Sequence, residues 1–127
     1  MEFIPKENGW RVNVTYGELH ISGDDTFGYR PYQLMIASIV GCSGSVFCKI
    51  LEKQRISIAG MSIKADVERN AKEANRIESI SLRFIVKGKN LNREKLNKNL
   101  RIARKNCAMV RSVEKSIHIT EEIQIIE

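Results

Sequence analysis

The stretch PYQLMIASIVGCSGSVFCKIL, residues 31–51, decides the fold of this 127-residue chain. It starts at Pro31, which a helix tolerates in its first turn because the first backbone N–H groups have no partner within the helix. Almost every side chain from Leu34 to Cys42 is apolar or small. A helix that is apolar on all sides is normally buried on all sides. We therefore predict a helix over residues 31–54 that other elements surround, some of them supplied by a second copy of the chain.

Length and composition indicate one globular domain over residues 1–127. Hydrophobic residues make up 43% of the chain and charged residues 28%, which is typical of a soluble protein. We find no run of about 18 apolar residues that would indicate a membrane span, and the N-terminus lacks the pattern of a secretory signal. We therefore expect a cytoplasmic protein with no membrane partner. Three cysteines in a reducing compartment argue against a framework of structural disulfides.

Alternating side chains on both sides of the long helix predict strands that could cover it. Before the helix, residues 10–22 indicate two short strands, followed by a loop at 22–28. After the helix, residues 57–68 and 77–87 predict an antiparallel hairpin, and residues 117–125 a final strand. The apolar positions expected to face inward in the second hairpin strand are Ile80, Leu82, Phe84 and Val86. Strands in groups with helices between them indicate an α+β fold rather than a repeated β-α-β unit.

A second helical pattern lies between the hairpin and the final strand. Asn92 is a suitable N-cap, and four residues after it recur at helical spacing: Leu96, Leu100, Ala103 and Cys107. The pattern continues to residue 117 and leaves open whether there is one helix or two helices broken near Asn106. If Asn106 caps a new helix, Cys107 lies in its first turn, where free N–H groups and the helix dipole favour a thiolate.

Positive charge is concentrated in residues 87–105. The chain has a formal net charge of +6, and this window holds a single acid, Glu94, and eight basic residues: Lys87, Lys89, Arg93, Lys95, Lys98, Arg101, Arg104 and Lys105. Such a window can bind nucleic acid or another anionic partner. It contains no interleaved aromatic residues and no nucleic-acid motif. We therefore expect the solvated face of an amphipathic helix, and no nucleic-acid partner.

The three cysteines are the main chemical candidates. In an intact helix Cys42 and Cys48 are separated by about 9 Å of rise, whereas a disulfide requires Cα atoms within roughly 7 Å. Cys107 lies on the apolar face of its own helix, and that face could meet the apolar face of the helix over residues 31–54. Free cysteines are commonly small buried hydrophobes, and we interpret Cys48 in this way.

Other chemistries have little support in the sequence. His20 and His118 are far apart and have no cysteine or aspartate at the spacing of zinc ligands. The segment Gly41–Gly44 lies within the predicted helix and not after a strand, so it is no phosphate-binding loop. No Ser-His-Asp order is identifiable. We expect neither a cofactor nor a metal.

Three segments together resemble the OsmC/Ohr superfamily, and most of all its shorter branch typified by YhfA. Residues 31–43, PYQLMIASIVGCS, are similar to the family helix with the pattern Pro-x-x-Leu…Gly/Ala-Cys-Ser/Thr. Residues 84–91, FIVKGKNL, and residues 106–117, NCAMVRSVEKSI, are similar to later segments, the latter to the helix with the second cysteine. The resemblance extends over nearly the whole chain.

This resemblance implies an intertwined homodimer in which antiparallel and mixed sheets wrap two central helices. It also implies a thiol-dependent peroxidase that reduces organic hydroperoxides. Cys42 would attack the peroxide as a thiolate and become a sulfenic acid. Cys107 would then form a disulfide with it, and an external dithiol would reduce that disulfide. Met35, Ile39 and Val46 would provide apolar surroundings for the peroxide.

The chain departs from the peroxidases of this family beside both cysteines. In those proteins a Glu follows the proline and holds an Arg over the thiolate, whereas this chain has Tyr32 and then Gln33. Arg30 and Arg11 are both candidates for the Arg, and we select Arg30. The second cysteine is usually followed by Pro, and here it is followed by Ala108.

Two classes of function are therefore considered. The first is a peroxidase-like redox protein with Cys42, Cys107 and Arg30 as catalytic residues. The alternative is a non-catalytic dimer that keeps the fold and binds a small apolar ligand between the central helices. The reactivity of the thiols toward an organic hydroperoxide distinguishes the two.

Overall fold

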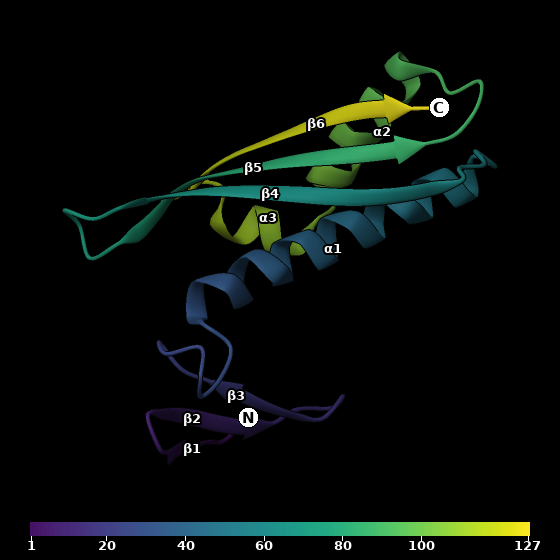
Figure 1. Ribbon diagram of the computed structural model, residues 1–127. Coiled ribbons are helices and arrows are strands. Elements are labelled where there is room, and N and C mark those ends of the chain that lie inside the picture. The colour runs from purple at the N-terminus through teal and green to yellow at the C-terminus, as the bar shows by residue number, and fades with distance from the viewer. The chain divides into compact units, whose positions relative to one another are not determined.

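The structure is a computed structural model that describes residues 1–127 (Figure 1). The chain forms two compact units, Met1–Ala37 and Ser38–Glu127. Helices and strands are mixed as the α+β prediction requires. In chain order the elements are β1 (Phe3–Lys6), β2 (Gly9–Asn13), β3 (Glu18–Ile21), α1 (Pro31–Lys53), β4 (Gly60–Asn70), β5 (Arg76–Lys87), α2 (Arg93–Lys105), α3 (Ala108–Val113) and β6 (His118–Ile126).

The first unit contains an antiparallel sheet with the strand order β1-β2-β3. The two predicted strands correspond to β2 and β3, whereas β1 was not predicted. Pro5 explains the omission, because a proline within an apolar run normally argues against a strand. The proline is tolerated here because β1 is an edge strand, where Pro5 lies opposite Trp10.

The second unit contains a sheet with the order β4-β5-β6. The predicted antiparallel hairpin of β4 and β5 is confirmed, and β6 runs parallel to β5. A parallel pair needs a long crossover connection, which α2 and α3 provide. Figure 1 shows α1 and α3 below β4 in this view, and α2 behind β5 and β6.

The core of the second unit lies between β5 and the helices. The residues predicted to face inward on β5, Ile80, Leu82, Phe84 and Val86, are at most 1% exposed. From α1, Phe47 packs its ring against Phe84 in an edge-to-face arrangement with 5.3 Å between the ring centroids. From α2, Leu96 and Leu100 are buried in the same way. This packing fixes the position of α1 beside the sheet.

Helix α1 is confirmed almost to the residue, but within one chain it is buried on one side only. Its fully buried residues are Ile39, Ser43, Gly44, Phe47 and Leu51. Gly41, Ser45 and Cys48 are exposed and follow one another at the i, i+4, i+7 spacing of a single helix face. The interpretation of Cys48 as a buried hydrophobe is therefore wrong for the isolated chain, because Cys48 lies on the face that turns away from the core.

The search for apolar runs in the sequence did not identify α1 as a helix with the length and composition of a membrane span. The helix has 23 residues and is long and apolar enough, by length and composition, to cross a membrane. The same properties occur in the core helices of proteins that do not enter membranes. Phe47 and Leu51, which lie in the second unit, are at most 3% exposed and pack against protein.

The segment after β5 forms two helices and not one. Asn92 caps α2 as predicted, since its side chain accepts a hydrogen bond from the Lys95 N–H at 3.0 Å. Leu96, Leu100 and Ala103 face the core. Most of the basic side chains predicted for the solvated face are exposed, including Lys95, Lys98, Arg101 and Lys105. The amphipathic interpretation of this segment is confirmed.

We predict that Phe47→Ala lowers the free energy of unfolding by about 3–5 kcal/mol, because it removes a fully buried ring from its contact with Phe84. Urea denaturation followed by circular dichroism measures the change. Tyr16→Ala is the matched control, because Tyr16 is fully exposed and its loss should change stability by less than about 0.5 kcal/mol. Equal losses for the two variants would contradict this description of the core.

Candidate functional site

The short helix α3 begins at a cysteine. Cys107 is its N-cap, with an extended backbone (φ −88°, ψ 107°), and its sulfur accepts a hydrogen bond from the Val110 N–H at 3.4 Å. Asn106 belongs to the end of α2, where its N–H bonds to the carbonyls of Ala103 and Arg104. Of the two arrangements that the sequence left open, the structure has two helices, and Cys107 rather than Asn106 caps the second. Its side chain is fully buried.

Cys42 lies on α1 where this helix meets the start of α3. Its sulfur accepts hydrogen bonds from the backbone N–H groups of Met109 and Ala108, and it is hydrogen-bonded to the Cys107 thiol. Cys42 is partly exposed, and both sulfurs are free thiols. The structure therefore brings together the two cysteines that the sequence singled out, although 64 residues separate them in the chain.

The surroundings of the two sulfurs shift their pKa values in opposite directions. Hydrogen bonds from the Met109 N–H, the Cys107 thiol and the Ala108 N–H lower the pKa of Cys42, and they outweigh its partial burial. Burial is the main reason that the pKa of Cys107 is raised. The helix start was expected to favour a thiolate at Cys107. Its amide groups instead support a thiolate at Cys42, and Cys107 remains the thiol that donates to it.

The two candidate arginines lie in the first unit. Arg30 immediately precedes α1, and its guanidinium carbon lies 4.8 Å from the centre of the Tyr32 ring, a cation–π arrangement. Arg11, on β2, lies 3.8 Å from a carboxylate oxygen of Glu18. The side chain that contacts Arg30 is therefore Tyr32, the second residue of α1.

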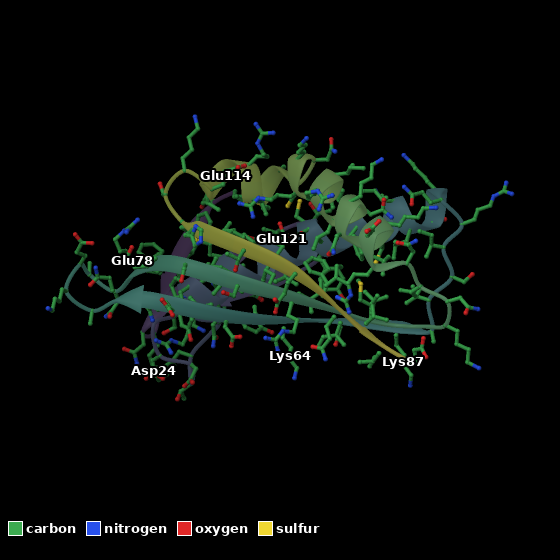
Figure 2. The ribbon with its side chains drawn as sticks, turned by 90° about the horizontal axis from the view of Figure 1, so that it is seen from above. Asp24, Lys64, Glu78, Lys87, Glu114 and Glu121 are labelled. Carbon is green, nitrogen blue, oxygen red and sulfur yellow. The ribbon has the colours of Figure 1, made fainter.

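The residue after Cys42 points to a group that sequence reasoning missed. The Ser43 hydroxyl donates a hydrogen bond to Oε2 of Glu121 on β6 at 3.0 Å. Glu121 occupies an inward position of β6, between the buried Ile119 and Ile123. An acid at such a position breaks the apolar alternation of the strand, and this was the signal in the sequence. Figure 2 labels Glu121, which lies on the helix side of β6.

The remaining surroundings are apolar or unsuited to a metal. Of the residues expected to receive an apolar peroxide, Ile39 is buried, Val46 is partly buried and Met35 is 42% exposed. The structure contains no group of three or more His, Cys, Asp or Glu side chains that could hold a metal ion. The site therefore contains two thiols, one with a lowered pKa and one with a raised pKa.

A comparison with protein families identifies the family of this chain. The family profile described as OsmC-like protein matches residues 22–122, which include both cysteines. The chain belongs to the OsmC-like family. Protein YhfA of Escherichia coli strain K12 is 26% identical to the chain over 97 residues, which cover 76% of this chain and 72% of YhfA.

Solved structures have the same OsmC-like fold. A hypothetical protein from Aquifex aeolicus matches with a TM-score of 0.87 at 21% identity, covering 98% of this chain and 93% of that protein. An organic hydroperoxide resistance protein OsmC from Legionella pneumophila matches with a TM-score of 0.73 at 16% identity, covering 98% and 97% of the two chains. The family thus includes organic hydroperoxide resistance proteins.

We predict that Ala108→Pro slows the alkylation of Cys42 at pH 7 by roughly two- to threefold, because it removes one N–H donor to the thiolate. Proline fits here, since Ala108 is the first residue of α3 and Cys107 before it has an extended backbone. Alkylation by iodoacetamide, resolved by peptide mass spectrometry, measures the rate. The exposed Cys48 is the internal control, and a slowing of Cys42 and Cys48 alike would contradict the assignment.

We also predict a pH-dependent stability difference between the wild type and Glu121→Gln. Burial raises the pKa of Glu121, against the opposing effects of Ser43 and Arg104. The folded protein therefore binds this proton more tightly than the unfolded chain, whose glutamates titrate near pH 4.3. Relative to the variant, the wild type should lose stability as the pH rises from about 4 through the raised pKa. Melting temperatures of both proteins from pH 4 to 8 test this, and a constant difference would contradict it.

Proposed function

We propose that this OsmC-like protein is a thiol-dependent peroxidase that reduces organic hydroperoxides, with Cys42 as the attacking thiolate and Cys107 as the resolving thiol. The observation that carries the proposal is the hydrogen-bonded contact between the two sulfurs, one with a lowered and the other with a raised pKa. A nucleophilic thiolate beside a second thiol is the arrangement that peroxide reduction requires. The organic hydroperoxide resistance proteins among the structural neighbours agree with this chemistry.

The reaction consists of three balanced steps. The Cys42 thiolate attacks the distal oxygen of the hydroperoxide, the O–O bond breaks, and the departing alkoxide takes a proton to become an alcohol. The resulting sulfenic acid condenses with the Cys107 thiol, forming the disulfide and releasing water. An external dithiol then reduces this disulfide by thiol–disulfide exchange and is itself oxidised. The net reaction converts a hydroperoxide and a dithiol into an alcohol, water and a disulfide.

The departures of this chain from the family's peroxidases are compatible with the proposal. Ala108 carries an N–H group, which a proline at that position would lack, and this group donates to the Cys42 sulfur. Tyr32 holds the guanidinium of Arg30 through its ring, where the other proteins use a glutamate. We propose Arg30 as the residue that supports the thiolate, and the amide groups of α3 as its second source of stabilisation.

The proposed enzyme is a homodimer in the cytoplasm. The exposed face of α1 is formed by small side chains, Gly41, Ser45 and Cys48, at helical spacing. Small side chains allow two helix backbones to approach closely. A second copy of α1 on this face would complete the burial that the apolar sequence of the helix requires.

We predict that one equivalent of an organic hydroperoxide, such as cumene hydroperoxide, removes two hydrogens per chain in intact mass spectrometry. Cys107→Ser should stop at the sulfenic acid, which a dimedone probe captures. Cys42→Ser should lose the reaction, because Cys107 is fully buried with a raised pKa and Cys48 lies outside the sulfur pair. Cys48→Ser is the matched control and should react like the wild type, since Cys48 is exposed and remote from the sulfur pair along α1.

The alternative function makes the opposite prediction. If the wild-type thiols react with the hydroperoxide no faster than free cysteine, the peroxidase proposal is wrong. The non-catalytic dimer with a small apolar ligand between its central helices then becomes the better description.

A further inference from the structure

Glu121 is a buried acid that the reaction proposed above does not use. It lies on β6 between Ile119 and Ile123, which are 3% and 7% exposed, and its own side chain is 4% exposed. Burying a carboxylate is unfavourable unless other groups compensate it. Leucine or isoleucine would fit the alternation of this strand without that cost. A residue that breaks a local rule of the fold in this way is a candidate for a functional role.

The partners of Glu121 connect it to the neighbours of both cysteines. Its Oε2 accepts the hydrogen bond of Ser43, which is fully buried and directly follows Cys42 on α1. Its Oε1 has no hydrogen-bond partner, and the guanidinium of Arg104 on α2 lies 3.8 Å away. The carbonyl of Arg104 accepts the N–H of Cys107 at 3.3 Å. Glu121 therefore contacts Ser43, one position after Cys42, and Arg104, three positions before Cys107.

We propose that Glu121 is a positioning residue for the sulfur pair, which holds α1 and the end of α2 to one point of β6 so that Cys42 meets the amide groups of α3. Hydrogen bonds weaken steeply when their distance or angle departs from the optimum, so a small rotation of α1 would cost Cys42 its donors. The consequence for peroxide reduction rests on the function proposed above. The effect on the acidity of Cys42 does not depend on that function.

Arg104 connects the end of α2 to β6 through two contacts, one of them with Glu121. Its guanidinium also donates to the Ile119 carbonyl at 2.6 Å, so it is held against the same strand that carries Glu121. The residue is therefore fixed by the backbone of β6 as well as by the charge of the acid. The turn that leads from α2 to Cys107 begins just after Arg104. The contacts of Arg104 with β6 therefore fix the position of this turn.

A direct electrostatic role for Glu121 predicts the opposite result. A carboxylate near Cys42 would disfavour a second negative charge and raise the pKa of the thiol. Removing the charge would then make Cys42 more reactive. If Glu121 acts by positioning, removing its contact with Ser43 makes Cys42 less reactive. The sign of the change separates the two explanations.

The test measures the alkylation of Cys42 in the fully reduced protein from pH 5 to 9, resolved by peptide mass spectrometry. We expect Ser43→Ala and Glu121→Leu each to slow Cys42 at pH 7 about threefold, which corresponds to the loss of roughly one hydrogen bond, and to shift its pH profile upward. Glu121→Gln should keep most of the rate, because its amide oxygen can still accept from Ser43. Ser45→Ala is the matched control, since the Ser45 hydroxyl bonds only to the Gly41 carbonyl of its own helix.

The double variant Ser43→Ala/Glu121→Leu should be no slower than Glu121→Leu alone, because Glu121→Leu already removes the contact with Ser43. An unchanged or faster Cys42 in Glu121→Leu, or additive losses in the double variant, would overturn the proposal. Leucine suits the apolar stripe of β6, and melting curves establish that this variant is folded. If alkylation responds as expected while hydroperoxide is not reduced, the peroxidase function fails and the positioning role stands.

Discussion

The hydrogen bonds that the start of α3 donates to Cys42 are the constraint on which this site depends. Two backbone N–H groups and the Cys107 thiol converge on one sulfur that is only partly exposed. The fold must therefore bring a residue of the long helix to the first turn of a short helix much later in the chain. The parallel pairing of β5 and β6 makes this possible, because the crossover between them places α2 and α3 beside α1.

The two sulfurs acquire different roles from one local geometry. The N-cap position buries Cys107 completely, and burial keeps its proton in place. The same turn leaves its first N–H groups without helical partners, and Cys42 receives them. A sulfur with a raised pKa and a sulfur with a lowered pKa are thus neighbours. The hydrogen bond from Ser43 to Glu121 connects the residue after Cys42 to the sheet.

The sequence predicted the elements with strong periodicity and missed what depends on three-dimensional contact. The apolar run after Pro31 and the alternation of β5 were sufficient for α1 and the hairpin, whereas the pairing of Cys42 with Cys107 rested on the family resemblance. Strand β1 was missed because it contains Pro5. A proline is tolerated in an edge strand, but the sequence does not show which strand lies at the edge. The residues around Cys42 in the sequence did not predict its lowered pKa, since the donors are backbone groups of another helix. Only the family resemblance implied a thiolate there. Glu121 was visible as an interruption between Ile119 and Ile123, but its partner Ser43 emerges only when α1 packs on the sheet.

The use of main-chain amides at Cys42 affects how the site tolerates change over evolution. Main-chain donors are present whatever side chain follows Cys107, so Ala108 and Met109 can vary widely without loss of the electrostatic support for the sulfur. A survey of this site by alanine scanning would overlook these groups altogether, because alanine retains the N–H. Only an imino acid, or a backbone ester introduced by chemical synthesis, would reveal them.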